Sequence, residues 1–292
     1  MSLWGRENEF ELLRGLAAAC QRGATGKIAI VTGPPGIGKT ALVQALARWS
    51  TDQGIPVHDS PDPARGGLLV LEDLHQASPA ELAAIAQLTG AIARQPVQPV
   101  QPFLVVLTAR PVPRRSDVDA LLARLTREQG ATWIELAPLE AATGTGPALL
   151  VRAGGNPQLL AILTAPAPGG DPAGGDPAGT DAAIARWLSF LPLEIRDLLA
   201  IASVLQPDCS LGELAALSGT PVGQLVPAVM EALAAGVLAE RGSRLGFAHP
   251  AVQEALYRQL PAPVRSGLHR EASRLLAEAG SLPERVAHHA LA

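Results

Sequence analysis

A glycine-rich segment near the N-terminus carries the residues best suited to chemistry. Residues 33–40 read Gly-Pro-Pro-Gly-Ile-Gly-Lys-Thr. The glycines let the backbone curl so that amide N–H groups point at phosphate oxygens, and the following helix adds its positive N-terminal end. Lys39 offers a charge to the β- and γ-phosphates of a nucleotide, and Thr40 a hydroxyl ligand for Mg²⁺. We predict a phosphate-binding loop here, and the alternative is an ordinary glycine-rich turn. The nucleotide contacts predicted from it are Gly33, Pro34, Pro35, Gly36, Ile37, Gly38, Lys39, Thr40 and Ala41.

Two adjacent acids, Glu72 and Asp73, follow an apolar run at 68–71. Adjacent residues of a strand point to opposite faces, so both acids can face one metal ion only if the strand ends there. We predict that Glu72 holds Mg²⁺ through water, together with Thr40, and that Asp73 polarises the attacking water. The two acids could exchange these roles. The alternative is a solvated strand end.

Arginine and asparagine positions refine this prediction. Arg110 ends the run FLVVLTAR, which we expect beside the strand of the loop, so its guanidinium could sense the γ-phosphate; the alternative is a surface arginine. Arg124 and Arg127 are candidates for completing the site of a neighbouring copy. The only asparagines, Asn8 and Asn156, do not precede lysine, so a guanine-reading Asn-Lys-x-Asp is absent and ATP is favoured.

The elements that position these residues form an α/β pattern over residues 1–137. An apolar run at 27–32 precedes the loop, and a helical pattern follows it. Further strand candidates are 55–58, 68–72, 103–108 and 132–136, with helices at 79–93 and 117–129. Continuous apolar strands are typical of a parallel sheet covered on both faces, as in a P-loop NTPase. A parallel crossover usually needs a dozen residues, and only about nine precede the third strand, so 55–58 is a degenerate edge piece or pairs unusually.

The remaining chain is predicted to be mostly helical. The turn 154–157 opens a helix in a shortened helical lid at 138–164, and the GGDPA repeats of 165–180 indicate a flexible linker. Helices are expected at 182–190, 193–205, 210–218 and 221–235, and two strands flank the turn 241–243. This pattern predicts a winged-helix domain at 181–260, and 261–292 begins a further helical region. We expect His288 and His289 on the surface of its last helix, and the chain looks cut from something longer.

Composition narrows the functional classes. Of 292 residues, 48% are hydrophobic and 17% charged, as in a globular protein. A net charge of -4, and the lack of basic residues in 221–236, argue against nucleic-acid binding by this segment. No apolar run reaches the roughly 18 residues of a membrane helix, and the N-terminus lacks a signal peptide, so we expect a cytoplasmic protein without membrane contact. Cys20 and Cys209 indicate neither a disulfide framework nor a metal site, and we expect both to be buried.

Several segments resemble one family of regulatory ATPases. Gly5-Arg6-Glu7, GPPGIGKT, LLVLEDLHQASP, VVLTARP, LAPL, GGNPQLL and FAHPAVQEALY follow one another in this order. The order resembles that of signal-transduction ATPases with numerous domains, in particular the ATPase module of large ATP-binding regulators of the LuxR type. The resemblance covers nearly the whole chain. The sequence departs from the family in a shorter stretch before Glu72 and in a short segment at 139–153.

The resemblance implies a function and further site residues. It implies a switch that binds ATP or ADP with Mg²⁺, closed and monomeric with ADP, open and self-associating with ATP, and slow in hydrolysis. It places Arg6 near the base, Pro157 on the adenine and His249 at the β-phosphate of ADP. DNA binding would belong to a C-terminal domain beyond these residues. The alternatives are an ATPase with steady turnover and a nucleotide-binding scaffold that no longer hydrolyses.

Overall fold

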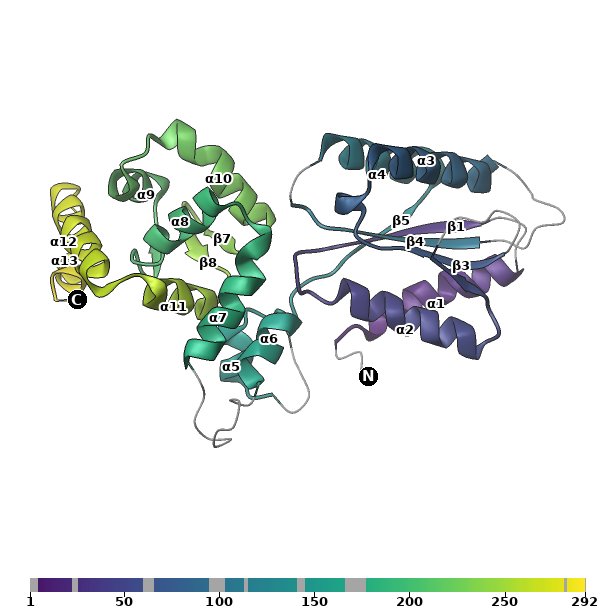
Figure 1. The fold of residues 1–292 in the computed structure, drawn as a ribbon, viewed down its shortest axis with the longest axis horizontal. Coiled ribbons are helices and arrows are strands. Elements are labelled where there is room, and N and C mark those ends of the chain that lie inside the picture. Colours follow the sequence, from purple (N-terminus) through teal and green to yellow (C-terminus); the bar gives the residue numbers. More distant parts are fainter. Residues whose placement is uncertain are drawn as a thin grey trace. The chain divides into compact units, whose positions relative to one another are not determined.

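The computed structural model describes residues 5–22, 26–59, 66–94, 103–112, 115–140, 145–165, 177–280 and 283–291. The chain forms two compact units, Met1–Thr145 and Gly146–Ala292 (Figure 1). Within the described ranges, none of the helices combines the length and apolar character needed to cross a bilayer.

The first unit is built on a parallel sheet of five strands. Its strands are β1 (Lys27–Thr32), β2 (Val57–His58), β3 (Gly67–Leu71), β4 (Phe103–Ala109) and β5 (Thr132–Glu135). They lie in the order β2-β3-β4-β1-β5, and every pairing is parallel. The predicted parallel α/β fold is confirmed. All four later strands arise at the predicted places, with ends shifted by a residue or two.

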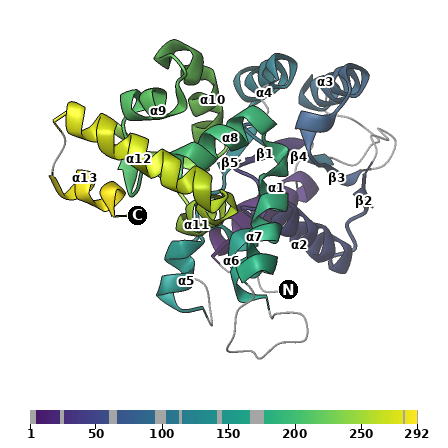
Figure 2. The same ribbon diagram turned by 60° about the vertical axis from the view of Figure 1, so that its left-hand side comes forward.

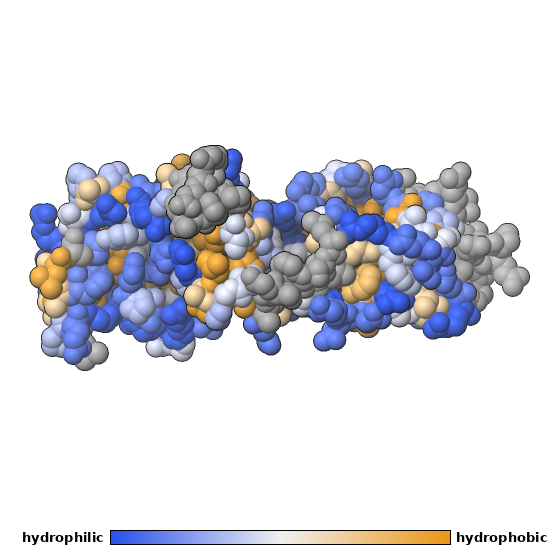
Figure 3. All heavy atoms as spheres, turned by 90° about the horizontal axis from the view of Figure 1, so that it is seen from below, coloured by the Kyte–Doolittle hydropathy of each residue, from blue (hydrophilic) through white to orange (hydrophobic). Residues whose placement is uncertain are grey.

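Helices cover both faces of this sheet. α1 (Glu7–Arg22) and α2 (Lys39–Asp52) lie on one face, and α3 (Pro79–Arg94) and α4 (Ser116–Gln129) on the other (Figure 1). Alternate residues of β1 enter opposite cores: Ala29 and Val31 pack with α1 and α2, whereas Ile28 and Ile30 pack with α3 and α4. Burial on both faces explains why the sequences of the central strands β1 and β4 are continuously apolar. Seen from below, the exposed side of the first unit is largely hydrophilic (Figure 3).

The strand register brings the carboxyl ends of β1, β3 and β4 to one edge. Thr32 pairs with Ala109, and Leu71 pairs with Leu107. The residues that follow these strands therefore start from neighbouring positions. β2 is only two residues long and pairs in parallel with β3 at the edge of the sheet, so 55–58 is a degenerate edge piece. A strand this short spans only about 7 Å, and a short connection suffices to return the chain.

The second unit is mainly helical and contains a small antiparallel sheet. Its helices are α5 (Pro147–Arg152), α6 (Pro157–Thr164), α7 (Pro177–Trp187), α8 (Leu193–Ala202), α9 (Leu211–Ser218), α10 (Val222–Ala234), α11 (Pro250–Gln259), α12 (Ala262–Glu278) and α13 (Pro283–Ala290). The strands β6 (Asp208–Cys209), β7 (Leu238–Arg241) and β8 (Arg244–Phe247) form a sheet in the order β6-β8-β7. α12 and α13 lie side by side at the C-terminal end (Figure 2).

Two expectations for the second unit are corrected. α7 begins at Pro177, so residues 177–180 of the expected linker are helical; proline at a helix start loses no hydrogen bond there. Residues 166–176 lie outside the described part of the chain, and the remaining linker and lid boundaries stay predictions. His289 is buried, with an exposed fraction of 2%, because α13 turns it toward α12, whereas His288 is exposed as expected. Cys20 and Cys209 are buried, as predicted.

Candidate functional site

The glycine loop connects β1 to α2 in a conformation that requires glycine. Gly33, Gly36 and Gly38 have φ angles of 149°, 76° and 106°, a region that side-chain-bearing residues rarely adopt. A Cβ atom on Gly33 would lie 2.9 Å from Ile37 Cγ2 and 3.2 Å from the Leu136 carbonyl oxygen. Gly33 is therefore confined by both the loop and the segment after β5. The backbone of this turn carries the N–H groups that we predict to meet phosphate.

Lys39 opens α2 and turns its side chain back over the loop. Its Nζ donates hydrogen bonds to the carbonyl oxygens of Gly33 at 2.6 Å and Pro34 at 3.0 Å. The residue is only 6% exposed. Its pKa is lowered to about 8, mainly by burial and also by the nearby Arg110 guanidinium, while Asp73 opposes both. The ammonium is thus held in a partly dehydrated place at the mouth of the loop, where a phosphate oxygen would be a stronger partner than a carbonyl.

Asp73 is the centre of a small polar cluster beyond β3. The strand ends at Leu71, and Asp73 takes a left-handed conformation with φ 55°. Its N–H donates to the hydroxyl of Thr108 on β4 at 2.8 Å. Asp73 Oδ1 lies 3.7 Å from Arg110 Nε and 3.6 Å from His75 Nδ1. The structure thus brings Asp73 and Arg110 together, and Thr108 fixes the turn between them.

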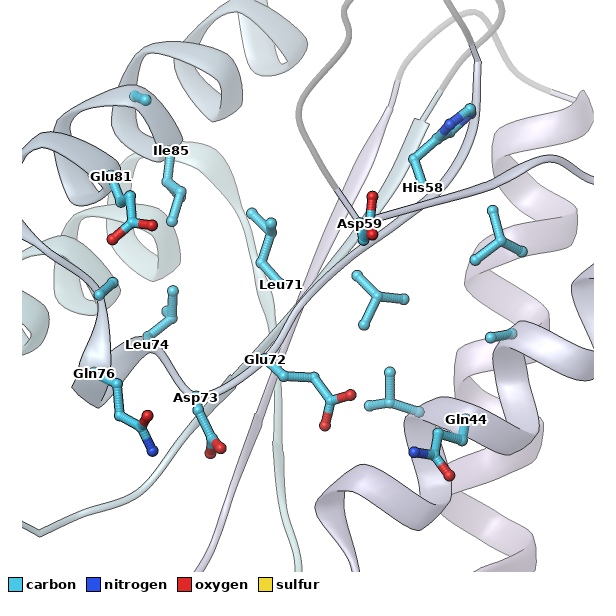
Figure 4. Close-up of a pocket in the computed structure, with 16 residues that line it drawn as sticks. Gln44, His58, Asp59, Leu71, Glu72, Asp73, Leu74, Gln76, Glu81 and Ile85 are labelled. Carbon is cyan, nitrogen blue, oxygen red and sulfur yellow. The ribbon is translucent and has the colours of Figure 1, made fainter.

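Glu72 and Asp73 point in different directions (Figure 4). Both residues follow the end of β3, so the strand-end condition for a shared site is met. Glu72 is exposed and turns toward Gln44 of α2, whereas Asp73 is partly buried. Among the described residues, no group of three or more His, Cys, Asp or Glu side chains is arranged to hold a metal ion. A hydroxyl such as that of Thr40 and a carboxylate nevertheless offer the hard oxygen ligands that Mg²⁺ prefers alongside water and phosphate.

Arg6 fastens the loop to two other segments. Its guanidinium donates to the carbonyl oxygens of Ile37 at 3.1 Å and Ala137 at 2.6 Å, and it pairs with Glu9 at 3.1 Å. Only 5% of the residue is exposed. Sequence spacing could not place it, because Arg6 and Ala137 are far apart in the chain. The resemblance did single out Arg6, and its role toward the nucleotide base stays a prediction.

Several residues around Glu72 and Asp73 were not predicted from the sequence to belong to the site. Arg115, just before α4, donates to the carbonyl oxygens of His75 at 3.1 Å and Ala77 at 2.5 Å, and it pairs with Asp117 at 2.6 Å. It therefore holds the turn that follows Asp73. His75 has a lowered pKa, caused first by burial and then by Arg110. The signal for Thr108 was present, since a polar residue ends an otherwise apolar strand next to Arg110.

His249 and Pro157 lie in the second unit. His249 precedes α11, and its Nδ1 lies 2.9 Å from the Ala153 carbonyl oxygen. Its ring packs edge-on against Trp187, and burial lowers its pKa to about 4, so the ring is neutral at pH 7. Pro157 starts α6 directly after Asn156, whose side chain caps the helix. Their predicted contacts with a nucleotide stay predictions.

The remaining predicted site residues are Thr40, Ala41, Arg124 and Arg127, and they lie on helices α2 and α4. Thr40 and Ala41 are exposed in the first turn of α2. Arg124 and Arg127 lie on α4, where Arg127 donates to the Ala123 carbonyl oxygen at 3.3 Å. A contribution of either arginine to a neighbouring copy stays a prediction.

Comparison with known proteins supports the first unit's architecture. Residues 2–66 match the model of the AAA ATPase domain family. A Walker-type ATPase of Pyrococcus abyssi superposes with a TM-score of 0.53 at 12% identity, covering 87% of this chain and 96% of that one. No curated protein matches the sequence.

Two further structures are similar over most of the chain. One is a signal transduction ATPase with numerous domains that has a tetratricopeptide repeat sensor, from Pyrococcus horikoshii, at 13% identity and a TM-score of 0.35. The superposition covers 98% of this chain and 47% of the other, so this chain spans about half the length of that protein. The other is Cdc6 of Pyrobaculum aerophilum, at 16% identity and a TM-score of 0.43, covering 89% of this chain and 96% of that one. The match of residues 2–66 to the AAA ATPase domain and the superposition on the Walker-type ATPase show that the parallel sheet has the fold of a P-loop ATPase.

Proposed function

We propose that the chain is an ATP- and ADP-dependent switch of a signalling ATPase, of the kind found in LuxR-type regulators. Gly33, Gly36 and Gly38 would curl around the phosphates, with backbone N–H groups and the start of α2 facing them. The ATPase fold and the family match of residues 2–66 support nucleotide binding. The signalling role and the assignment to LuxR-type regulators rest on the order of the sequence motifs.

The observation that carries this proposal is the position of Lys39. Its buried ammonium donates to two carbonyl oxygens of the loop itself, those of Gly33 and Pro34. A triphosphate would replace these neutral acceptors with charged ones, and charge-assisted hydrogen bonds are roughly twice as strong as neutral ones. Lys39 would thereby bind the β- and γ-phosphates, and its low exposure would strengthen the attraction.

We assign ATP hydrolysis, which the resemblance implies to be slow, to the cluster around Asp73. Asp73 would orient and polarise a water molecule, while Arg110 would stabilise charge that develops on the γ-phosphate. Thr40 and Glu72 would hold Mg²⁺, which supplies charge neutralisation to the phosphates when bound. Thr108 and Arg115 would fix the turn that carries Asp73, because they bond its backbone and that of the following residues.

The second unit would change its conformation according to whether ADP or ATP is bound. The order of α8, β6, α9, α10, β7 and β8 is typical of a winged helix. His249 would bind the β-phosphate of ADP and Pro157 would pack on the adenine, which stabilises a closed monomer. ATP would favour an open form that self-associates. Moving such an equilibrium from 1:99 to 99:1 requires about 5.5 kcal/mol of difference in binding free energy between the two forms.

Nucleotide binding can be tested with the two lysines of the chain. Lys39→Ala removes the ammonium at the loop, whereas Lys27→Ala removes an exposed ammonium at the start of β1 and serves as the matched control. Isothermal titration calorimetry with ATP and with ADP should show binding for the control and none for Lys39→Ala. Equal affinity of the two variants would refute the assignment of the site.

The switch is tested by oligomeric state and turnover. Light scattering after size exclusion should show a monomer with ADP and a larger assembly with ATP. Turnover well below about 1 s⁻¹, the low end of typical enzymes, is expected. Faster turnover with no change of assembly would favour an ATPase with steady turnover, and bound ADP with no turnover would favour a scaffold.

A further inference from the structure

His75 lies beside the carboxylate that we assign to polarising water, yet it has no role in the hydrolysis proposed above. It belongs to the short 3₁₀ helix η1 (Leu74–Gln76), which starts directly after Asp73. Only 7% of its side chain is exposed, so the ring is shielded from water. A polar ring in such a place costs free energy unless its nitrogen atoms form hydrogen bonds.

The surroundings of the ring indicate which nitrogen carries its proton. The side-chain nitrogen of Gln76 lies 3.4 Å from His75 Nε2. An amide nitrogen can only donate a hydrogen bond, so the ring nitrogen that it meets is the acceptor. The pKa of His75 is lowered mainly by burial and also by Arg110, so the imidazole is neutral at pH 7 and has a single N–H group. We therefore assign this proton to Nδ1.

The Nδ1 atom of His75 is buried and faces Asp73. It lies 3.6 Å from Asp73 Oδ1 and has no hydrogen-bond partner among the described residues. Arg110 Nε is likewise buried and unpartnered there, and it lies 3.7 Å from the same oxygen. Hydrogen bonds from nitrogen to oxygen are usually about 2.7–3.2 Å long, so a shift of the carboxylate by less than about 1 Å would complete either bond. One carboxylate oxygen thus has two buried donors just beyond bonding distance.

The backbone around His75 is fixed, which keeps the ring beside Asp73. Arg115 donates to the carbonyl oxygens of His75 at 3.1 Å and Ala77 at 2.5 Å. The Gln76 N–H group donates to the Asp73 carbonyl oxygen at 2.8 Å and closes the turn. The side chains of Asp73 and Gln76 extend to the same side of this turn (Figure 4). The Asp73 carboxylate, with its side chain 35% exposed, is therefore the part of this arrangement that is free to turn.

We propose that His75 is a positioning residue for ATP hydrolysis and that its Nδ1–H group holds Asp73 Oδ1. This inference rests on the proposed function, in which Arg110 turns toward the γ-phosphate. His75 then remains beside the carboxylate as the second of its two donors. Its hydrogen bond fixes the rotation of the carboxylate and leaves Oδ2 to face the attacking water. A neutral donor also lowers the basicity of the carboxylate less than a cation would.

The donor can be isolated with two variants of nearly equal shape. Asparagine and leucine both branch at Cγ, and the asparagine amide can place its nitrogen where His75 has Nδ1. His75→Asn therefore keeps a donor for Asp73, whereas His75→Leu fills the same space without one. Single-turnover hydrolysis of ATP by the full chain gives the rate constant of the chemical step, and calorimetry gives the affinity for ADP.

The rate constant and the affinity should respond differently. His75→Leu should lower the rate constant about tenfold, and His75→Asn by less than about threefold, because only leucine removes the hydrogen bond. Both variants should bind ADP like the unaltered chain. Equal rate constants for the two variants, whether high or low, would overturn the proposal, and so would a loss of ADP affinity that accounts for the slower reaction. An unaltered chain that binds ATP without hydrolysing it would overturn the proposed hydrolysis and this role together.

The position of the proton is measured without nucleotide. Proton–nitrogen correlation spectra of the chain with ¹⁵N-labelled histidine show which ring nitrogen is protonated, and His75→Asn identifies the signals of His75 by their loss. We expect the proton on Nδ1. A proton on Nε2 would overturn the proposal, since Nδ1 could then donate nothing to Asp73. This result does not depend on nucleotide binding, so it separates a failure here from a failure of the proposed function.

Discussion

The Lys39 ammonium lies 2.6 Å from the carbonyl oxygen of Gly33. The loop's own backbone therefore holds the positive charge that, in our proposal, binds the phosphates of the nucleotide. This contact closes the loop on itself. A bound phosphate must compete with it, and the protonation state of Lys39 therefore controls the competition.

Nucleotide affinity should fall at alkaline pH. The pKa of Lys39 is lowered to about 8, so the side chain is charged below this value and neutral above it. Phosphate binding favours the charged form, and affinity should fall roughly tenfold for each pH unit above 8. Calorimetric titration with ADP between pH 7 and 9.5 measures the slope. Lys39→Arg, which stays charged, should remove most of it. A slope shared by both proteins would contradict this role of Lys39.

Thr108 should stabilise the turn at Asp73. Thr108→Val keeps the shape of the side chain but removes the acceptor for the Asp73 N–H group, whose hydrogen bond is 2.8 Å long. This donor is partly buried, so leaving it unpaired should lower the free energy of unfolding by about 1 kcal/mol, the low end of the range for buried groups. Thr108→Ser keeps the hydroxyl and should cost less. Chemical denaturation of all three proteins gives the comparison, and equal stability of the Val and Ser variants would exclude the hydrogen bond as the cause.

Gly154 should tolerate no side chain, for a steric reason beyond its backbone angle. It has φ 53°, and a Cβ atom would lie 2.2 Å from the Ala248 carbonyl oxygen and 2.3 Å from His249 Nδ1. Gly219 has a similar φ of 67° with open space around it. Gly219→Ala should therefore cost only about 1 kcal/mol for the left-handed conformation. Gly154→Ala should cost clearly more, as measured by thermal unfolding, and similar losses would contradict the packing of this turn against His249.

The second unit should lose stability in acid because of a buried histidine pair. His269 Nδ1 and His289 Nδ1 are 2.9 Å apart, and Tyr257 Oη lies 2.9 Å from His269 Nε2. The pKa of His289 is lowered to about 4, mainly by burial and also by the charges of His269, His288 and Arg285, while Glu213 opposes them. The unfolded chain then binds more protons than the folded one between pH 6.5 and 4, so stability falls as the pH drops through this window.

The size of this effect can be isolated with one substitution. A histidine pKa of about 4 in the folded state predicts a loss near 2 kcal/mol between pH 7 and pH 5. His289→Leu removes the titrating group from its 2% exposed position and should reduce the loss by about that amount. Thermal unfolding at the two pH values measures it. His288→Leu, at an exposed position of the same helix, is the control and should behave like the unaltered protein.

Local sequence patterns predicted the elements that carry the candidate site. The glycines at 33, 36 and 38 demand unusual backbone angles, so the loop could be recognised without knowing its neighbours. Apolar runs predicted the strands of the parallel sheet, and its central strands β1 and β4 are buried on both faces, so their sequences show no alternation. The short strand β6 was not predicted. The ends of the elements were less certain: α7 starts four residues before the expected domain boundary, because a proline-rich repeat can also open a helix.

Contacts between distant segments were decided only by the tertiary structure. Arg6 meets Ala137, Thr108 meets Asp73, and His289 meets His269 through side-chain bonds that no local pattern encodes. The sequence by itself determined a glycine-rich loop between a strand and a helix, and two acids and an arginine at strand ends. The strand order β2-β3-β4-β1-β5 decided which of them lie together, because register and burial depend on packing across the whole sheet rather than on neighbours along the chain.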